Sequence, residues 1–186
     1  MSQVTIARTE ARMSSTAKSW LSDTVRGLRA RLIKDLNDGL ESTYRLGIPA
    51  SRAELDEERT RKRKRLDDWL DEQARANNRG QKETVAQARL RHRDTAVKLV
   101  AATWLNRLVV LGQMEALGLV RTPVFTGGIN SKGFQEFREF APALSAEHDE
   151  SYPFLLNLVF EELALDLPGL FGQAGLTGLI PMPTAT

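Results

Sequence analysis

The chain has 186 residues, a net charge of +2 and no cysteine. This length is enough for one domain with a hydrophobic core, and the lack of cysteine excludes a disulfide framework, a thiol catalyst and a Cys-based zinc site. Two histidines, His92 and His148, leave little material for a His-rich metal site, and we interpret both as solvent-exposed or capping residues. The N-terminus lacks the apolar core of a secretory signal, so we expect a cytoplasmic protein.

The charge is unevenly distributed along the chain. Residues 1–93 hold 21 Lys and Arg against 14 Asp and Glu, a net charge of +7. Residues 94–186 hold 5 against 10, a net charge of −5. Such asymmetry indicates a surface that faces a nucleic acid or another partner, and it informs association rather than fold.

Residues 1–14 show no periodic pattern and are expected to form a disordered leader, followed by a single helical domain over 15–186. A first helix is predicted from about Ser15, and Gly47 and Pro49 end it. Its apolar stripe consists of Leu21, Val25, Leu28, Leu32, Leu36 and Leu40. The arginines beside this stripe form either a solvated face, the simpler interpretation, or a face toward phosphates.

Ser51 and Glu54 have the spacing of a capping box, which predicts a second helix from about Arg52. This helix carries a basic cluster of six residues, Arg59, Arg61, Lys62, Arg63, Lys64 and Arg65. Acidic residues flank the cluster and predict the i, i+4 pairs Glu57–Arg61, Glu58–Lys62 and Lys64–Asp68. The cluster is therefore either a self-paired, solvent-exposed face or a contact to the DNA backbone, where Lys and Arg displace counterions from phosphates.

A central helix is predicted over about 95–118, and with the preceding one it forms a long, charged helical hairpin over 52–118. It is apolar nearly all round, so we expect it to be buried among other helices. One stripe contains Leu99, Ala102, Leu105, Val109, Met114 and Leu117, and the other Val97, Val100, Trp104, Leu108 and Leu111. A membrane span needs roughly 20 mostly apolar residues. Polar and charged residues interrupt this run, so we predict a core helix and no membrane partner.

The C-terminal part is less regular. Residues 120–150 are expected to form an irregular connection, with a turn at Gly127–Gly133 and a short helix carrying Phe134, Phe137 and Phe140. A last helix is predicted over 153–167, with Pro153 as its first residue and Pro168 ending it. The apolar residues near the end of the chain predict a fragment of a larger protein, or a segment whose continuation packs on them.

The sequence contains no recognisable catalytic motif. It lacks GxSxG, HExxH, a phosphate-binding P-loop and a GxGxxG after a strand. We therefore assign no catalytic, cofactor-binding or metal-binding residue in this chain. The residues alone predict an all-α helical bundle with a basic N-terminal half.

Part of the central helix resembles a known family. Residues 103–111 read TWLNRLVVL and are followed by Met114, Glu115 and Gly118. This run resembles the TWFNRLVALRxME…G signature in the N-terminal helical region of PglX-like adenine-specific DNA methyltransferases, which belong to BREX and DISARM phage-defence or restriction–modification systems. The later stretches FLL, FEEL, LPGLF and LIP are also similar, so the resemblance covers residues 84–186. Leu105 departs from it, since the signature has Phe there.

The resemblance implies N6-adenine methylation with S-adenosylmethionine as cofactor. The catalytic core of that family needs a Gly-rich cofactor loop and an Asn/Asp-Pro-Pro-Tyr/Phe motif for the flipped base, and neither occurs here. The chain would then be an inactive helical segment that scaffolds the catalytic domain of the same protein, with Trp104, Asn106 and Arg107 as domain contacts and double-stranded DNA as a further partner. The alternatives are a free-standing, non-enzymatic helical interaction or nucleic-acid-binding protein and an oligomeric structural bundle.

Overall fold

A computed structural model describes residues 14–77, 83–145, 148–173 and 175–181. These residues form six α-helices and no strand, which confirms the all-α prediction. The α-helices are α1 (Ser15–Tyr44), α2 (Glu57–Asn77), α3 (Val85–Ala116), α4 (Lys132–Phe140), α5 (His148–Asp166) and α6 (Pro168–Phe171). Three short 3₁₀ helices are η1 (Ala50–Arg52), η2 (Gly128–Asn130) and η3 (Gly175–Gly178).

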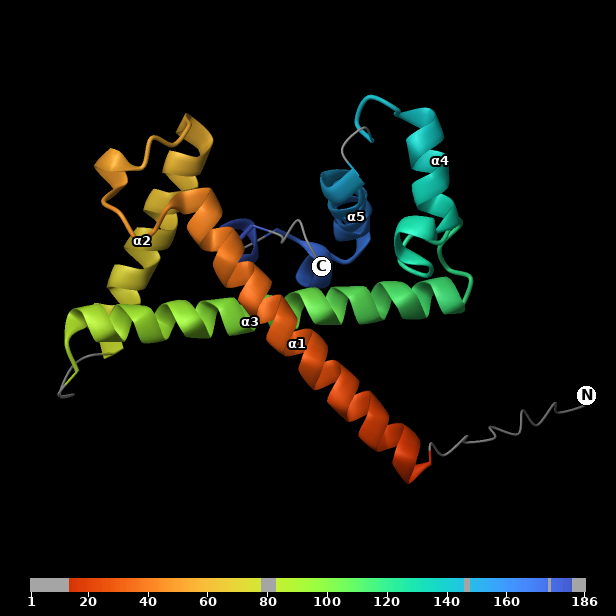
Figure 1. The fold of residues 1–186 in the computed structure, drawn as a ribbon, viewed down its shortest axis with the longest axis horizontal. Helices are drawn as coiled ribbons and strands as arrows, with labels where there is room; N and C mark the ends of the chain where they lie inside the picture. The colour runs from red at the N-terminus through yellow and green to blue at the C-terminus, as the bar shows by residue number, and fades with distance from the viewer. Residues whose placement is uncertain (1–13, 78–82, 146–147, 174, 182–186) are drawn as a thin grey trace, which may run out of the picture.

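The long helix α3 is the axis of the fold (Figure 1). It contacts α1, α2, α6 and η3, while α5 packs against α4 and α6. Figure 1 shows α2 near the N-terminal end of α3 and α4 near its C-terminal end. Helix α1 crosses α3, and its N-terminal part extends beyond the other helices. The predicted leader lies outside the described residues except for Ser14, whose Oγ caps α1 by accepting the N–H of Ala17 at 3.2 Å.

Only the C-terminal half of the predicted α1 stripe is buried. The buried stripe residues are Leu32, Leu36 and Leu40, and Tyr44 at the end of α1 is buried with them. The other three stripe residues are exposed, Leu21 by 44%, Val25 by 47% and Leu28 by 53%. We call these three residues the α1 apolar face. Their spacing continues the buried stripe, but the part of α1 that carries them extends beyond the helices that would cover it (Figure 1).

The predicted start of the second helix is wrong. Glu54 has φ +48°, so it lies in the left-handed region and cannot belong to the first turn of a helix that begins at Arg52. Residues 50–52 form η1 instead, and α2 begins at Glu57. Asp56 supplies the cap, because its Oδ1 accepts the N–H of Arg59 at 2.8 Å. The capping function is thus provided by an Asp five residues after the predicted Ser.

Helix α3 is buried along one side, not all round. It begins with a true capping box, in which the Thr84 hydroxyl and the Gln87 side chain accept each other's backbone N–H. Trp104 and Leu111 lie in the core, whereas Leu99 is 55% and Val109 is 59% exposed. The exposed side of α3 is therefore largely the first predicted stripe, which consists of Leu99, Ala102, Leu105, Val109, Met114 and Leu117. Other helices approach α3 from the side of Trp104, which the sequence pattern could not distinguish.

Two further properties of α3 bear on the predictions. By length and composition alone, α3 is the one described helix that could cross a membrane. A core helix passes the same test, and α3 occupies the centre of this bundle.

His92 is buried, which corrects its predicted exposed or capping role. It lies four residues after the buried Ala88 and four before the buried Ala96, on the face toward the other helices.

The connection and the last helix differ in detail from the prediction. The glycine-rich stretch forms the turn around η2, and α4 contains the three phenylalanines, of which Phe134 is buried. Helix α5 begins at His148, so Pro153 lies inside it and is not its first residue. At this sixth helical position the proline lacks the N–H that would bond the carbonyl four residues earlier, and its ring crowds that carbonyl, so α5 is one backbone hydrogen bond short near its start. Pro168 follows the end of α5, as predicted, and opens α6.

Candidate functional site

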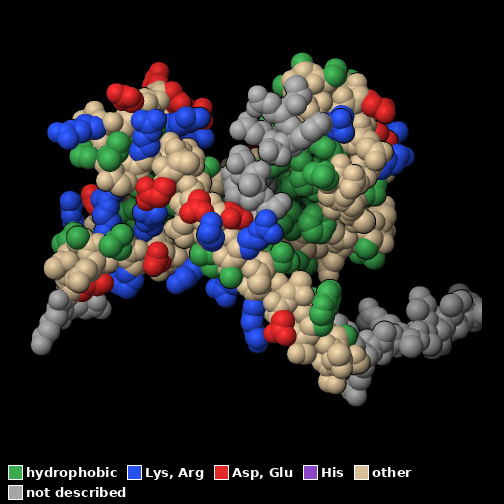
Figure 2. Space-filling view, viewed as in Figure 1, with side chains coloured by type: hydrophobic (Ala, Val, Ile, Leu, Met, Phe, Trp, Pro, Cys, Tyr) green, Lys and Arg blue, Asp and Glu red, His purple; other side chains and the backbone are tan. Residues whose placement is uncertain are grey.

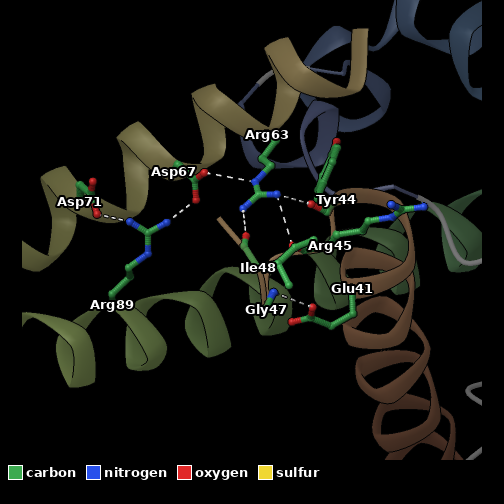
Figure 3. Close-up of polar contacts among 9 residues, drawn as sticks. All are labelled: Glu41, Tyr44, Arg45, Gly47, Ile48, Arg63, Asp67, Asp71 and Arg89. Carbon is green, nitrogen blue, oxygen red and sulfur yellow. Dashed lines mark hydrogen bonds and ion pairs between the residues drawn. The ribbon is translucent and has the colours of Figure 1, made fainter. Parts of the chain in front are cut away.

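One member of the basic cluster, Arg63, is buried and serves the interior of the fold (Figure 3). Its guanidinium donates to the carbonyls of Tyr44 at 2.8 Å, Arg45 at 3.3 Å and Ile48 at 2.6 Å. These carbonyls lie at and just after the end of α1, where a helix leaves its last C=O groups without intrahelical partners. Arg63 therefore fastens α2 to the end of α1 and is not available on the surface for DNA.

An ion-pair network continues from Arg63 to α3. Its Nε lies 3.5 Å from the carboxylate of Asp67. Arg89 of α3 donates to both Asp67 and Asp71 of α2, so one guanidinium bridges two turns of the facing helix (Figure 3). The network joins the end of α1, the middle of α2 and the start of α3. This is a structural role that sequence analysis missed, because Arg89 is 22 residues from Asp67.

The predicted local ion pairs of the basic cluster are confirmed. Arg61 lies 3.7 Å from Glu57, Lys62 lies 2.7 Å from Glu58, and Lys64 lies 2.6 Å from Asp68. Figure 2 shows the basic and acidic side chains intermixed over α2. The whole helix has seven basic and six acidic residues, hence a net charge of only +1. Whether the exposed members of the cluster bind DNA stays a prediction.

A groove of about 730 Å³ separates the N-terminal half of α2 from α5. Arg59, Lys62 and Arg65 lie along its α2 wall, whereas Arg61 and Lys64 are not part of its lining. The α5 wall carries Phe154, Asn157, Leu158 and Glu161. Tyr44, Trp104 and the segment 177–181 complete it. The structure thus divides the exposed basic residues into a groove-facing set and an outward-facing set, a division that the sequence run does not reveal.

The residues of the family resemblance have different environments. Trp104 and Arg107 are buried, while Asn106 is exposed. Arg107 donates from Nε to the carbonyl of Leu170 at 2.8 Å and from Nη2 to that of Gly172 at 2.7 Å. Its Cζ lies 5.0 Å from the centroid of the Trp104 ring, a cation–π contact. Burial lowers the pKa of Arg107. Arg107 thus anchors α6 to α3, since Leu170 lies in α6. That Trp104, Asn106 and Arg107 contact a further domain stays a prediction.

Glu115, another residue of that resemblance, holds the segment after α3. Its Oε1 accepts the N–H groups of Val124 and Phe125, each at 2.7 Å, and its Oε2 accepts the N–H of Thr126 at 2.8 Å. Burial raises the pKa of Glu115, but the hydrogen bonds from Thr126, Phe125 and Val124 outweigh it, so the net pKa lies below the ordinary value. The carboxylate is therefore a charged anchor for the connection to α4.

The C-terminal segment is held by a third side chain. The hydroxyl of Tyr44, at the end of α1, donates to the carbonyl of Leu179 at 2.6 Å. Phe171 and Ile180 are both buried in the same core. The apolar residues near the end of the chain thus pack on α1 and α3 of the chain itself. For the other two anchors, Arg107 and Glu115, the sequence offered one signal, namely a charged residue within the apolar helix α3.

Comparison with known proteins gives no match: no protein-family model, no curated protein and no solved structure matches this chain. Among the described residues, no group of three or more His, Cys, Asp or Glu side chains is placed to hold a metal ion. The structure has three candidate binding surfaces. They are the α1 apolar face, the outward-facing cations of α2 and the groove.

Proposed function

We propose that this chain is the N-terminal helical segment of an adenine-specific (N6) DNA methyltransferase and acts as a scaffold for a catalytic domain of the same protein. The resemblance in α3 supports this assignment. Arg107 and Glu115 of that signature organise the segments that follow α3, which gives the signature a physical purpose in the scaffold. S-adenosylmethionine would bind in the catalytic domain, since we assign no cofactor residue here.

The α1 apolar face is the observation that carries the scaffold function. Leu21, Val25 and Leu28 form one stripe that continues the core of the bundle but is exposed. Apolar surface left in water is unfavourable by roughly 25 cal/mol per Å², so a stripe with helical spacing favours a partner that covers it. In the proposed enzyme that partner is the catalytic domain.

The test begins with the gene. The reading frame should continue past Thr186 into a Gly-rich cofactor loop and an Asn-Pro-Pro-Tyr type motif. The catalytic part, expressed as a separate polypeptide, should co-purify with residues 1–186. The variant Val25→Asp/Leu28→Asp should lose co-purification, because it places two charges in the apolar contact, while circular dichroism should show an unchanged helical fold.

The matched control is Ser19→Asp/Ala30→Asp, which adds the same charge on the opposite side of α1. This variant should co-purify as the unchanged chain does. The proposal is overturned if the reading frame lacks those motifs, or if the two double variants co-purify equally well.

A second candidate function, duplex-DNA contact through α2, is favoured by the exposure of Arg61 and Lys64, whose side chains are 69% and 74% accessible. Binding to a DNA duplex should weaken as salt rises, because each neutralised phosphate releases counterions. In Arg61→Ala/Lys64→Ala, the slope of log K against log salt should become shallower by roughly 1.8, the value for two phosphate contacts.

The control for this prediction is Arg59→Ala/Arg65→Ala, which removes the same charge from the groove wall, where a duplex does not fit. Its slope should change less. Absence of binding at low salt, or equal slopes for both variants, would mean that α2 presents a self-paired, solvated face and does not contact duplex DNA.

A further inference from the structure

The groove between α2 and α5 is a second binding surface, separate from the α1 apolar face. Its volume of about 730 Å³ lies in the range of pockets that bind small ligands. Helices α2 and α5 form two of its walls, and the C-terminal segment after α6 forms a third. Trp104, which is 3% exposed, lies at its base.

The charges of the groove are balanced, and most of them are already paired. Arg59 lies 3.3 Å from Asp56 and Lys62 lies 2.7 Å from Glu58, all on the α2 wall. Two charges remain without an ion-pair partner within the described part of the chain. They are Arg65 on the α2 wall and Glu161 on the α5 wall. The groove therefore offers one free cation on one side and one free anion on the other.

This balance disfavours a nucleic acid as the occupant. Single-stranded nucleic acids bind in grooves of positive potential, where several cations follow the phosphate backbone. Here three cations, Arg59, Lys62 and Arg65, are matched by three anions, Asp56, Glu58 and Glu161. Such walls give no net attraction for a polyanion. They do favour a ligand that carries both charges, with its acid toward α2 and its base toward α5.

The remaining lining fits a polypeptide. Phe154 is 42% and Leu158 is 41% exposed on the α5 wall, and both offer apolar surface to side chains. Asn157 and Gln173 add amide groups that both donate and accept hydrogen bonds, as a peptide backbone requires. In the described part of the chain the Trp104 indole N–H has no acceptor, so the base of the groove is short of a hydrogen-bond acceptor.

We propose that this groove binds a peptide segment of a partner protein that carries an acidic and a basic residue separated by apolar residues. The acidic residue pairs with Arg65, the basic residue pairs with Glu161, and the apolar residues between them pack on Phe154 and Leu158. The site is independent of the proposed scaffold function, because it involves neither the α1 apolar face nor the outward-facing cations of α2.

The test is a selection from a phage-displayed library of random octapeptides against the full chain. The unchanged protein should enrich peptides with one acidic and one basic residue around an apolar centre. Arg65→Glu leaves two unpaired anions on the walls, the new Glu and Glu161, and should shift the enrichment to peptides with two basic residues. Glu161→Lys leaves two unpaired cations, the new Lys and Arg65, and should shift the enrichment to peptides with two acidic residues.

Matched controls are Arg61→Glu and Glu162→Lys, which make the same charge changes at exposed positions outside the groove lining. They should enrich the same peptides as the unchanged protein. A synthetic peptide from the selection should bind Arg65→Glu roughly tenfold more weakly than the unchanged protein, as expected for the loss of one favourable charge pair. In a Trp20→Phe/Trp69→Phe background, its binding should change the fluorescence of Trp104.

The proposal is overturned if no peptide is enriched, if the groove and control variants select the same sequences, or if the peptide leaves Trp104 fluorescence unchanged. Failure of the catalytic part to co-purify would leave these readouts unaffected, so the two proposals fail separately. Circular dichroism of each variant should show that its helical content is unchanged.

Discussion

Replacing Arg107 with alanine should lower the free energy of unfolding by about 4 kcal/mol, because two hydrogen bonds from a charged donor are lost, two partly buried carbonyls lose their donor and a large buried side chain is removed. Arg107 is 1% exposed and is among the largest of the fully buried side chains in the part of the chain that the structure describes. Its two carbonyl partners, on Leu170 and Gly172, lie 63 and 65 residues later in the chain. The variant therefore both creates a cavity and releases the C-terminal segment from α3.

The measurement is urea-induced unfolding followed by circular dichroism. Asn106→Ala is the matched control, since Asn106 is the exposed neighbour and its replacement should change the free energy of unfolding by at most about 0.5 kcal/mol. Arg107→Lys should be intermediate, because one ammonium group does not reproduce the two-pronged geometry of the guanidinium. Equal unfolding midpoints for Arg107→Ala and Asn106→Ala would contradict the anchoring role of Arg107.

Replacing Glu115 with glutamine should lower the free energy of unfolding by about 3 kcal/mol near neutral pH, since it weakens three charge-assisted hydrogen bonds. The glutamine oxygen still accepts, but its amide nitrogen faces an N–H group that it cannot bond. The backbone N–H groups of Val124, Phe125 and Thr126 then lose part of their pairing. We expect the connection between α3 and α4 to exchange its amide hydrogens faster in this variant.

The same residue predicts a pH dependence of stability. The pKa of Glu115 in the folded chain is below its ordinary value of 4.5, so the unfolded chain takes up this proton first as the pH falls. The stabilisation is complete above that ordinary value and is lost as the pH falls through the lower, folded-state pKa. As the pH falls from neutral to acidic, the free energy of unfolding of the unchanged protein should therefore approach that of Glu115→Gln. Parallel curves would show that Glu115 is not the group that titrates.

Local sequence rules worked where a few neighbouring residues decide the structure. The start of α1 after Ser14 follows from a capping side chain and an apolar repeat, both read within one or two turns. The ion pairs of the basic cluster follow from i, i+4 spacing alone, so they formed as predicted. The prediction for the start of α2 was wrong because the sequence offers two capping residues, Ser51 and Asp56. In the structure Asp56 is the one that caps the helix.

The sequence by itself determined the all-α class, the long central helix, the absence of a recognisable catalytic motif and the self-paired character of α2. Tertiary structure alone decided which side of α3 is covered and that half of the α1 stripe is exposed, because an apolar stripe does not specify where its partner ends. It also decided that Arg63 and Arg107 are buried anchors. Their acceptors are carbonyls 15 to 65 residues away, and a carbonyl leaves no trace in the amino-acid sequence.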